Sequence, residues 1–172
     1  MFGLSPLGVF HTVTGLAALV AGFWELARDR EISPKSGLGR FYLATTLVSA
    51  ATALGIFHHG GFGPAHVLAI VTLAALVLGT VCALTPLFGE ASRYLQAGSY
   101  SATILCHVIP GVTEVLIRFP RSAPLMRLSE PQAFRPVYGA LAGAFLLGLA
   151  AQLRWLRAEE KLRRASGASP AQ

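Results

Sequence analysis

Long runs of apolar residues, separated by short polar segments, dominate this chain. Four runs cover residues 7–27, 64–87, 94–119 and 137–156, and a shorter one covers residues 41–57. A helix that crosses a bilayer needs about 20 mostly apolar residues, because each residue rises about 1.5 Å and the hydrocarbon is about 30 Å thick. The pattern therefore predicts an all-α integral membrane helical bundle with five transmembrane helices, or four if the short run does not span.

Composition supports a membrane environment. Of the 172 residues, 53% are hydrophobic and only 13% are charged, whereas soluble domains carry about 25% charged residues. The spans place one transmembrane domain in residues 1–156. Residues 157–172 form a charged tail, and its Ser-, Gly- and Pro-containing end is predicted to be disordered.

The basic residues predict the orientation of the bundle. Ten of the 14 fall in the loops and the tail on one side of the membrane, namely Arg28, Arg30, Lys35, Arg40, Arg93, Arg154, Arg157, Lys161, Arg163 and Arg164. The other side holds Arg118, Arg121, Arg127 and Arg135. The positive-inside rule then puts the N-terminus outside and the C-terminus in the cytoplasm. This division between two membrane faces argues against nucleic-acid binding, and the lipid bilayer is the expected partner. Residues 120–136 are expected to form an ordered external cap or a short interfacial helix.

The five histidines are the main candidates for chemistry. With this orientation His11, His58, His59, His66 and His107 all lie in the outer half of the membrane or near its middle. Ionisable groups in hydrocarbon usually face the bundle interior and mark functional sites. Metal ions and haem iron both favour imidazole ligands.

Two predicted spans carry matching polar faces. At 100° per residue, His107, Gly111, Glu114 and Arg118 share one face of the fourth span, and Pro110 is predicted to kink that helix. On the first span, His11 shares a face with Gly15, Gly22 and Glu25. Small residues on that face would let another backbone or a flat ligand approach closely.

These faces leave two cofactors open, haem b or a transition metal ion. Haem b would be held between His11 and His107, with His66 as a third ligand candidate. On upright helices His11 and His107 differ by about 10 Å in depth. A metal ion bound by His11, His66 and Glu114, with His58 and His59 as secondary ligands, fits this simple geometry better. Arg118, Pro110, Gly15 and Gly22 would support either site.

Two motifs resemble a family of small bacterial multi-span membrane proteins known only as a domain of unknown function. The first is the early histidine His11 followed by the Gly-Arg-x-Tyr entry of residues 39–42. The second is His-x-x-Pro-x-x-Thr-Glu-x-x-x-Arg-x-Pro in residues 107–120. The resemblance implies a multi-pass protein of the bacterial cytoplasmic (inner) membrane, and it implies no activity.

Three functions remain open at this level. The favoured one is a membrane redox or metal-binding protein, whose enzymatic role, if any, would be electron transfer with quinone or another redox partner. The second is a proton- or metal-coupled transporter or channel that uses His107 and Glu114 as a relay and works as a homo-oligomer. The third is a structural or accessory membrane subunit. No residue can be assigned a catalytic role, because Walker, HExxH, GxSxG and Rossmann motifs are absent from the sequence.

Overall fold

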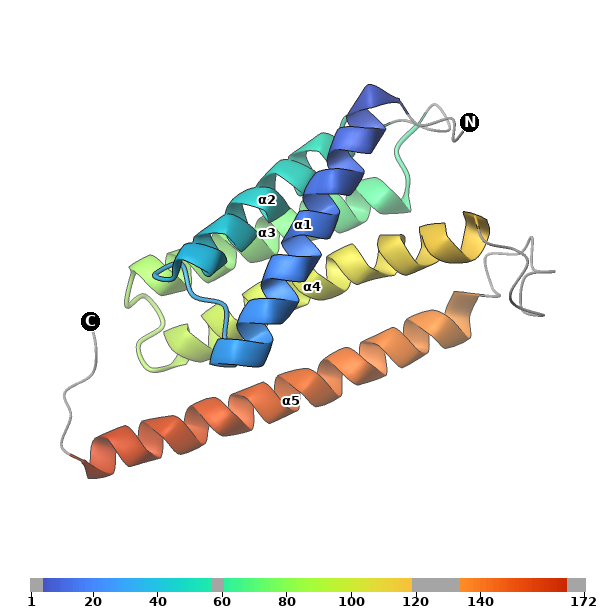
Figure 1. The fold of residues 1–172 in the computed structure, drawn as a ribbon. Coiled ribbons are helices and arrows are strands. Elements are labelled where there is room, and N and C mark those ends of the chain that lie inside the picture. The colour runs from blue at the N-terminus through green and yellow to red at the C-terminus, as the bar shows by residue number, and fades with distance from the viewer. Residues whose placement is uncertain (1–4, 57–60, 119–133, 167–172) are drawn as a thin grey trace.

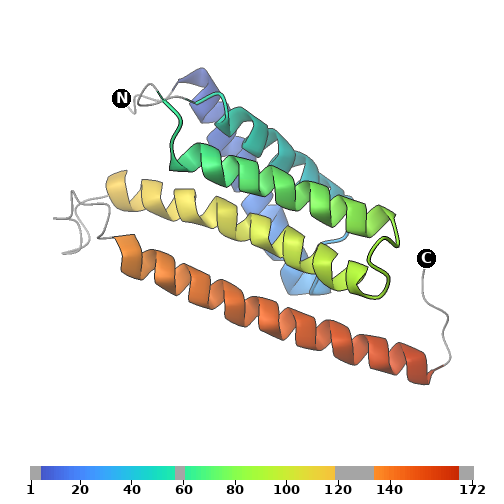
Figure 2. The same cartoon turned by 180° about the vertical axis from the view of Figure 1, so that it is seen from behind.

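The computed structural model describes residues 5–56, 61–118 and 134–166, and within them the chain forms five α-helices. They are α1 (Pro6–Asp29), α2 (Gly37–Ala53), α3 (Pro64–Leu84), α4 (Ala91–Arg118) and α5 (Arg135–Ala165). Each helix runs antiparallel to the one before it, and α5 lies along α4 on one side of the bundle (Figures 1 and 2). The predicted all-α helical bundle is therefore confirmed.

Four of these helices are long and apolar enough to cross a membrane, namely α1, α3, α4 and α5. α2 has only 17 residues, which gives it a length of about 26 Å. It nevertheless carries the chain across the bundle, since α1 and α3 begin at the same end (Figure 1). At the C-terminus, α5 continues as a helix to Ala165, so the predicted charged tail begins as helix. The predicted cap of residues 120–136 falls largely outside the described residues.

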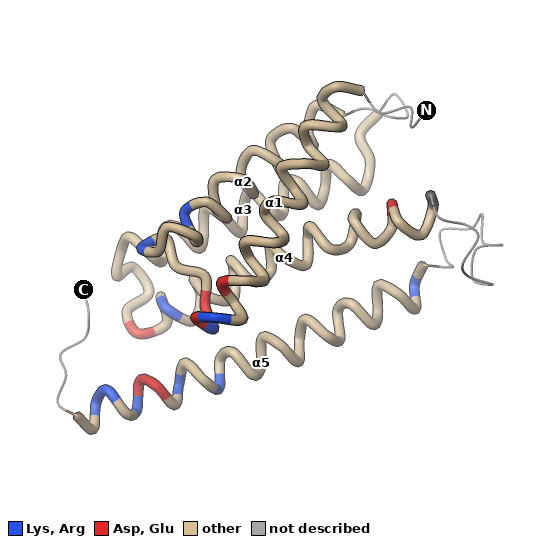
Figure 3. The backbone as a smooth tube through the Cα atoms, in the orientation of Figure 1, with Lys and Arg blue, Asp and Glu red and all other residues tan. Residues whose placement is uncertain are grey.

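Most of the Lys and Arg residues in the described helices lie toward one end of the bundle, here called the basic end (Figure 3). It comprises the C-terminal parts of α1 and α5, the N-terminal parts of α2 and α4, and the α1–α2 loop. Arg93 of α4 binds Glu31 of that loop at 2.9 Å and Glu159 of α5 at 2.6 Å. One guanidinium therefore joins three segments that are far apart in sequence.

A buried carboxylate holds the α1–α2 loop at the basic end. Glu25 of α1 is fully buried, and its Oε1 accepts hydrogen bonds from the Ser36 hydroxyl and from the backbone N–H of Ser33. Ser36 is the N-cap of α2 and its Oγ accepts from the Gly39 N–H at 2.8 Å. The same hydroxyl thus caps α2 and binds Glu25, so the start of α2 is fixed relative to α1.

Two more side chains bind the carbonyls of this loop. Gln96 of α4 donates to the Ile32 carbonyl at 3.2 Å, and Gln152 of α5 donates to the Arg30 carbonyl at 2.7 Å. Buried backbone carbonyls need such partners. The loop is consequently held by side chains from α1, α4 and α5.

Tyrosine rings that rest on glycines bring the helices together in the core. The Tyr42 ring of α2 covers Gly22 of α1, where an added Cβ would lie 2.6 Å from the ring. Its hydroxyl reaches across to Thr103 of α4 at 2.5 Å. Close backbone approach at small residues and hydrogen bonds between helices are the main sources of helix association in lipid.

A second pair repeats this arrangement between α3 and α4. The Tyr100 ring covers Gly79, and its hydroxyl lies 3.2 Å from the Thr80 hydroxyl. Both tyrosines of these two contacts are fully buried. Together the two contacts set the spacing of α1, α2, α3 and α4.

Gly39→Ala should destabilise the protein, because a Cβ at this position would collide with the Ser33 carbonyl oxygen and lie within 3 Å of the Glu25 carboxylate. Overpacking of this kind costs about 1–3 kcal/mol. Gly37→Ala is the matched control, because the space around Gly37 is open. We expect thermal unfolding in detergent, followed by circular dichroism, to occur at a clearly lower temperature for Gly39→Ala alone. Equal midpoints for the two variants would contradict this account of the loop.

Candidate functional site

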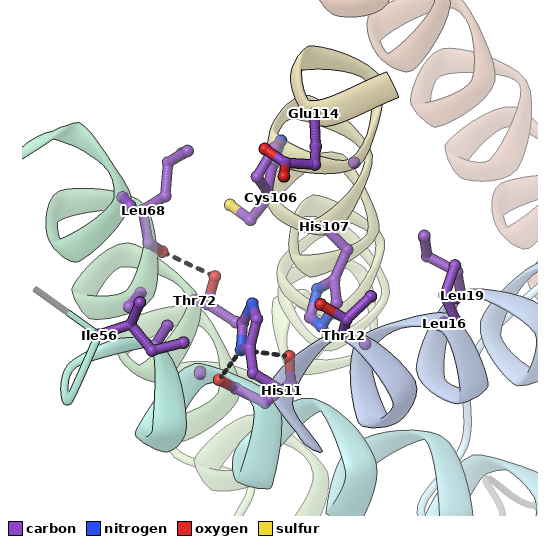
Figure 4. A pocket seen from close by; sticks show the side chains of 18 of the residues that line it. His11, Thr12, Leu16, Leu19, Ile56, Leu68, Thr72, Cys106, His107 and Glu114 are labelled. Atoms are coloured by element: carbon purple, nitrogen blue, oxygen red, sulfur yellow. Dashed lines mark hydrogen bonds between the residues drawn. The ribbon is translucent and has the colours of Figure 1, made fainter. Parts of the chain in front are cut away.

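A cavity of about 460 Å³ lies between α1, α2, α3 and α4, toward the end of the bundle opposite the basic end. Its wall is mostly apolar, with a few polar side chains, which is typical of small-molecule and cofactor sites. The lining residues are Gly8, His11, Thr12, Gly15, Leu16, Leu19, Ser49, Ala50, Ala53, Ile56, Ala65, Leu68, Ala69, Thr72, Cys106, His107, Pro110, Gly111, Glu114 and Val115. Figure 4 shows how the side chains surround this space.

His11 enters the cavity from α1 and is tied to α2. Its Nδ1 lies 2.9 Å from the Ser49 carbonyl oxygen and 3.3 Å from the Thr52 hydroxyl. A carbonyl only accepts hydrogen bonds, so this contact requires a hydrogen on Nδ1. In the neutral ring, Nε2 then carries the lone pair.

His107 enters from α4 and is held in the same way. Its Nδ1 lies 2.8 Å from the Thr103 carbonyl oxygen, one helical turn earlier. Its Nε2 is buried and has no hydrogen-bond partner among the described residues. A buried polar atom without a partner costs about 1–3 kcal/mol. Such an atom on the wall of a cavity is therefore a candidate ligand-binding group.

The two histidines are closer in depth than the sequence predicted. A Cβ added at Gly15 would lie 3.8 Å from Cδ2 of His107 and 3.2 Å from the Ser49 hydroxyl. His107 therefore sits at the level of Gly15, which is one helical turn, or about 6 Å, from His11. The packing of α4 against α1 removes part of the expected 10 Å difference.

Glu114 and Cys106 complete the polar part of the wall on α4. Glu114 lines the cavity two turns beyond His107, about 10 Å farther along the helix. Cys106 precedes His107 and is a free cysteine. Figure 4 shows both side chains on the cavity side of α4. Pro110 and Gly111 also line the cavity, and α4 continues as a helix through Pro110.

His66 has a different place and a different tautomer. It is the N3 residue of α3, and its Nδ1 accepts a hydrogen bond from the Gly63 N–H at 3.1 Å, while its ring stacks on Phe62. The lone pair of Nδ1 is therefore occupied by this hydrogen bond and is not available to bind a metal ion. The neutral ring then carries its hydrogen on Nε2. His66 is not among the residues that line the cavity. This arrangement caps a helix start and does not face His11.

The metal site expected from His11, His66 and Glu114 is not supported. Among residues 5–56, 61–118 and 134–166, no three His, Cys, Asp or Glu side chains form a group that could hold a metal ion. The secondary candidates His58 and His59 lie outside the described residues. The side chain of Arg118 also lies outside the described part of the structure. Gly22 lies under Tyr42 and not on the cavity wall, whereas Gly15 lies on it.

Sequence reasoning missed the residues of α2 that hold His11. Tyr42, Thr46 and Ser49 of α2 are buried in the helix packing. The role of Ser49 is carried by its backbone carbonyl, which no residue pattern distinguishes from any other carbonyl. Thr72 of α3, another lining residue, lies within the mostly apolar run of residues 64–87 and belongs to no motif in the sequence.

The chain was compared with protein-family models, with curated proteins and with solved structures, and none of the three comparisons found a match. The resemblance to small bacterial membrane proteins, with its two motifs, stays a prediction. The case for function rests on the cavity and its two histidines.

The hydrogen bonds predict opposite tautomers for the histidines of the described helices. His11 and His107 should carry hydrogen on Nδ1, and His66 should carry it on Nε2, in the neutral state. Imidazole ¹⁵N chemical shifts of the labelled protein in detergent, at a pH where the rings are neutral, distinguish the two forms. His107→Gln and His66→Gln variants assign the signals. A hydrogen on Nε2 of His107 would remove the lone pair on which the cavity's ligand-binding capacity depends.

Proposed function

We propose that this chain is a membrane redox protein that binds haem b in the cavity between α1 and α4. The observation that carries the proposal is that His107 lines the cavity and that its buried Nε2 has no hydrogen-bond partner among the described residues. Bundle proteins commonly build cofactor sites from side chains on facing helices. Histidine is a common axial ligand of haem iron.

The surroundings of both imidazoles fit this role. A histidine that ligates a metal usually donates its other ring N–H to a carbonyl or a carboxylate, which fixes its orientation and raises its basicity. His107 makes this bond to Thr103 and His11 makes it to Ser49. His107 and His11 are the residues that would hold the haem.

The remaining wall suits a flat apolar macrocycle. Gly111 leaves open space at the wall, and seven of the twenty lining residues are leucine or alanine. Bound haem would supply one-electron chemistry at its iron. The lining side chains would orient the haem and exclude water from it. Glu114, at the far end of the wall, would be the carboxylate that accepts or releases a proton. A membrane quinol or a reduced redox protein would supply the electron, and a quinone or an oxidised redox protein would accept it.

Optical spectroscopy tests this proposal directly. Protein expressed in haem-replete cells and purified in mild detergent should show a Soret band that shifts on reduction with dithionite. We expect His107→Ala to abolish the band and His11→Ala to change or abolish it, since each removes an imidazole that would hold the haem. Metal analysis of the same samples should give about one iron per chain, because the two histidines together would hold one haem.

His66→Ala is the matched control, because it removes a histidine of the same bundle without touching the cavity. It should retain the band and lose some thermal stability with its helix cap. A colourless protein from haem-replete cells would refute haem binding. Stoichiometric zinc, copper or iron without a Soret band would replace haem with a metal ion as the cofactor.

A proton- or metal-coupled transporter is the second candidate function, and one observation favours it. Glu114 and His107 line the same cavity, and an ionisable pair inside a membrane protein is a common proton relay. Proteoliposomes with an internal pH dye should then show proton uptake that Glu114→Gln slows by at least about tenfold, the loss expected when one relay group is removed. Flux equal to that of empty liposomes would exclude this function.

A further inference from the structure

The two tryptophans of the chain are Trp24, near the end of α1, and Trp155, in the C-terminal half of α5, and both helices end at the same end of the bundle (Figure 1). Trp24 stands about 27 Å along α1 from Pro6, and Trp155 about 30 Å along α5 from Arg135. Both are exposed on the bundle surface, at 66% and 37%. Tryptophan is enriched at the level of the lipid headgroups. The pair therefore marks one headgroup plane, at the basic end.

At this plane α5 carries three basic side chains on one face. Arg154, Arg157 and Lys161 are spaced by three and four residues, so they lie along one stripe of the helix. All three are exposed. We call them the α5 stripe. Arg154 adjoins Trp155 in sequence, and the stripe extends from the headgroup plane away from the hydrocarbon.

The acidic residues near the stripe already form ion pairs with other basic residues. Glu159 binds Arg93 and Arg163, and Glu160 binds Arg164 and accepts from the Tyr94 hydroxyl. The other described acidic residues at the basic end also have partners. Asp29 pairs with Arg28, Glu31 with Arg93, and Glu90 with Arg164. Glu25 is buried and accepts hydrogen bonds from Ser33 and Ser36.

In contrast, no ion pair involves the α5 stripe within residues 5–56, 61–118 and 134–166. The Arg157 guanidinium lies 5.9 Å from the centre of the Tyr94 ring, a contact that leaves its N–H donors available. Three exposed cations at headgroup depth thus lack an acidic partner from the described chain.

We propose that the α5 stripe binds the headgroups of anionic phospholipids. Basic clusters directly beyond a transmembrane helix attract anionic lipids. Arginine also offers a planar pair of donors that matches a phosphate. Lipid binding at the stripe would fix the tilt and depth of α5. Among the four helices long and apolar enough to span, α5 has the smallest buried share of its apolar window.

Fluorescence quenching by brominated lipids tests the proposal with the tryptophan that lies next to the stripe. In Trp24→Phe, reconstituted into vesicles, Trp155 is the sole tryptophan. Brominated phosphatidylglycerol should quench it with a binding constant at least about fivefold above that of brominated phosphatidylcholine. In the same background, Arg154→Gln/Arg157→Gln/Lys161→Gln should bring the ratio near one.

Variants that each remove one positive charge distinguish binding by the α5 stripe from an effect of the protein's net charge. Arg157→Gln should lower the ratio, whereas Arg163→Gln, which removes a cation paired with Glu159 on the same helix, should preserve it. All these side chains are exposed, and circular dichroism confirms that the variants are folded. An equal loss in Arg163→Gln would assign the preference to net charge and overturn the proposal. Equal quenching by the two lipids in Trp24→Phe would overturn it as well.

Discussion

The hydrogen bonds between Glu25 and the N-cap of α2 are the constraint on which the rest of the structure depends. They place the first turn of α2 beside the last turns of α1, through Ser36 and Ser33. From there the register of α2 follows at 1.5 Å per residue. Tyr42 arrives over Gly22, and Ser49 arrives beside His11. A buried polar contact at one end of the bundle thereby determines which carbonyl orients the imidazole near the other end.

This dependence is a consequence of folding in lipid. Lipid tails are as apolar as leucine, so burial of apolar surface between helices gives little driving force there. The contacts that remain specific are close packing at small residues and hydrogen bonds. Tyr42 and Tyr100 combine both, because each ring covers a glycine on one helix and each hydroxyl meets a threonine. The cavity lies beyond these contacts, where the lining residues at the helix crossings are alanine, glycine and leucine.

The all-helical fold was predictable from the sequence, because apolar length is a local property that each segment carries by itself. Four spanning helices and the faces of His11 and His107 followed from length and 100° periodicity. What could not be predicted is how far one helix is shifted along another, since that depends on contacts such as Gly15 with His107. The role of His66 was missed for a related reason. Its position three residues after Gly63 is typical of a helix start, but a histidine at a predicted membrane edge also fits a metal ligand, and only the Gly63–His66 hydrogen bond separates the two.

The two ends of the bundle differ in how their polar groups are paired. At the basic end, each described carboxylate has an ion-pair or hydrogen-bond partner on at least one oxygen, although Oε2 of the buried Glu25 has no partner among the described residues. At the cavity, His107 is oriented by one nitrogen and left without a described partner at the other. An imidazole that served only to lock helices would gain more by bonding through both nitrogens, as the price of an unsatisfied buried atom is comparable to the gain from a whole hydrogen bond. Under the redox proposal a bound group would give that atom its partner, whereas a purely structural role would leave it unsatisfied beside the cavity.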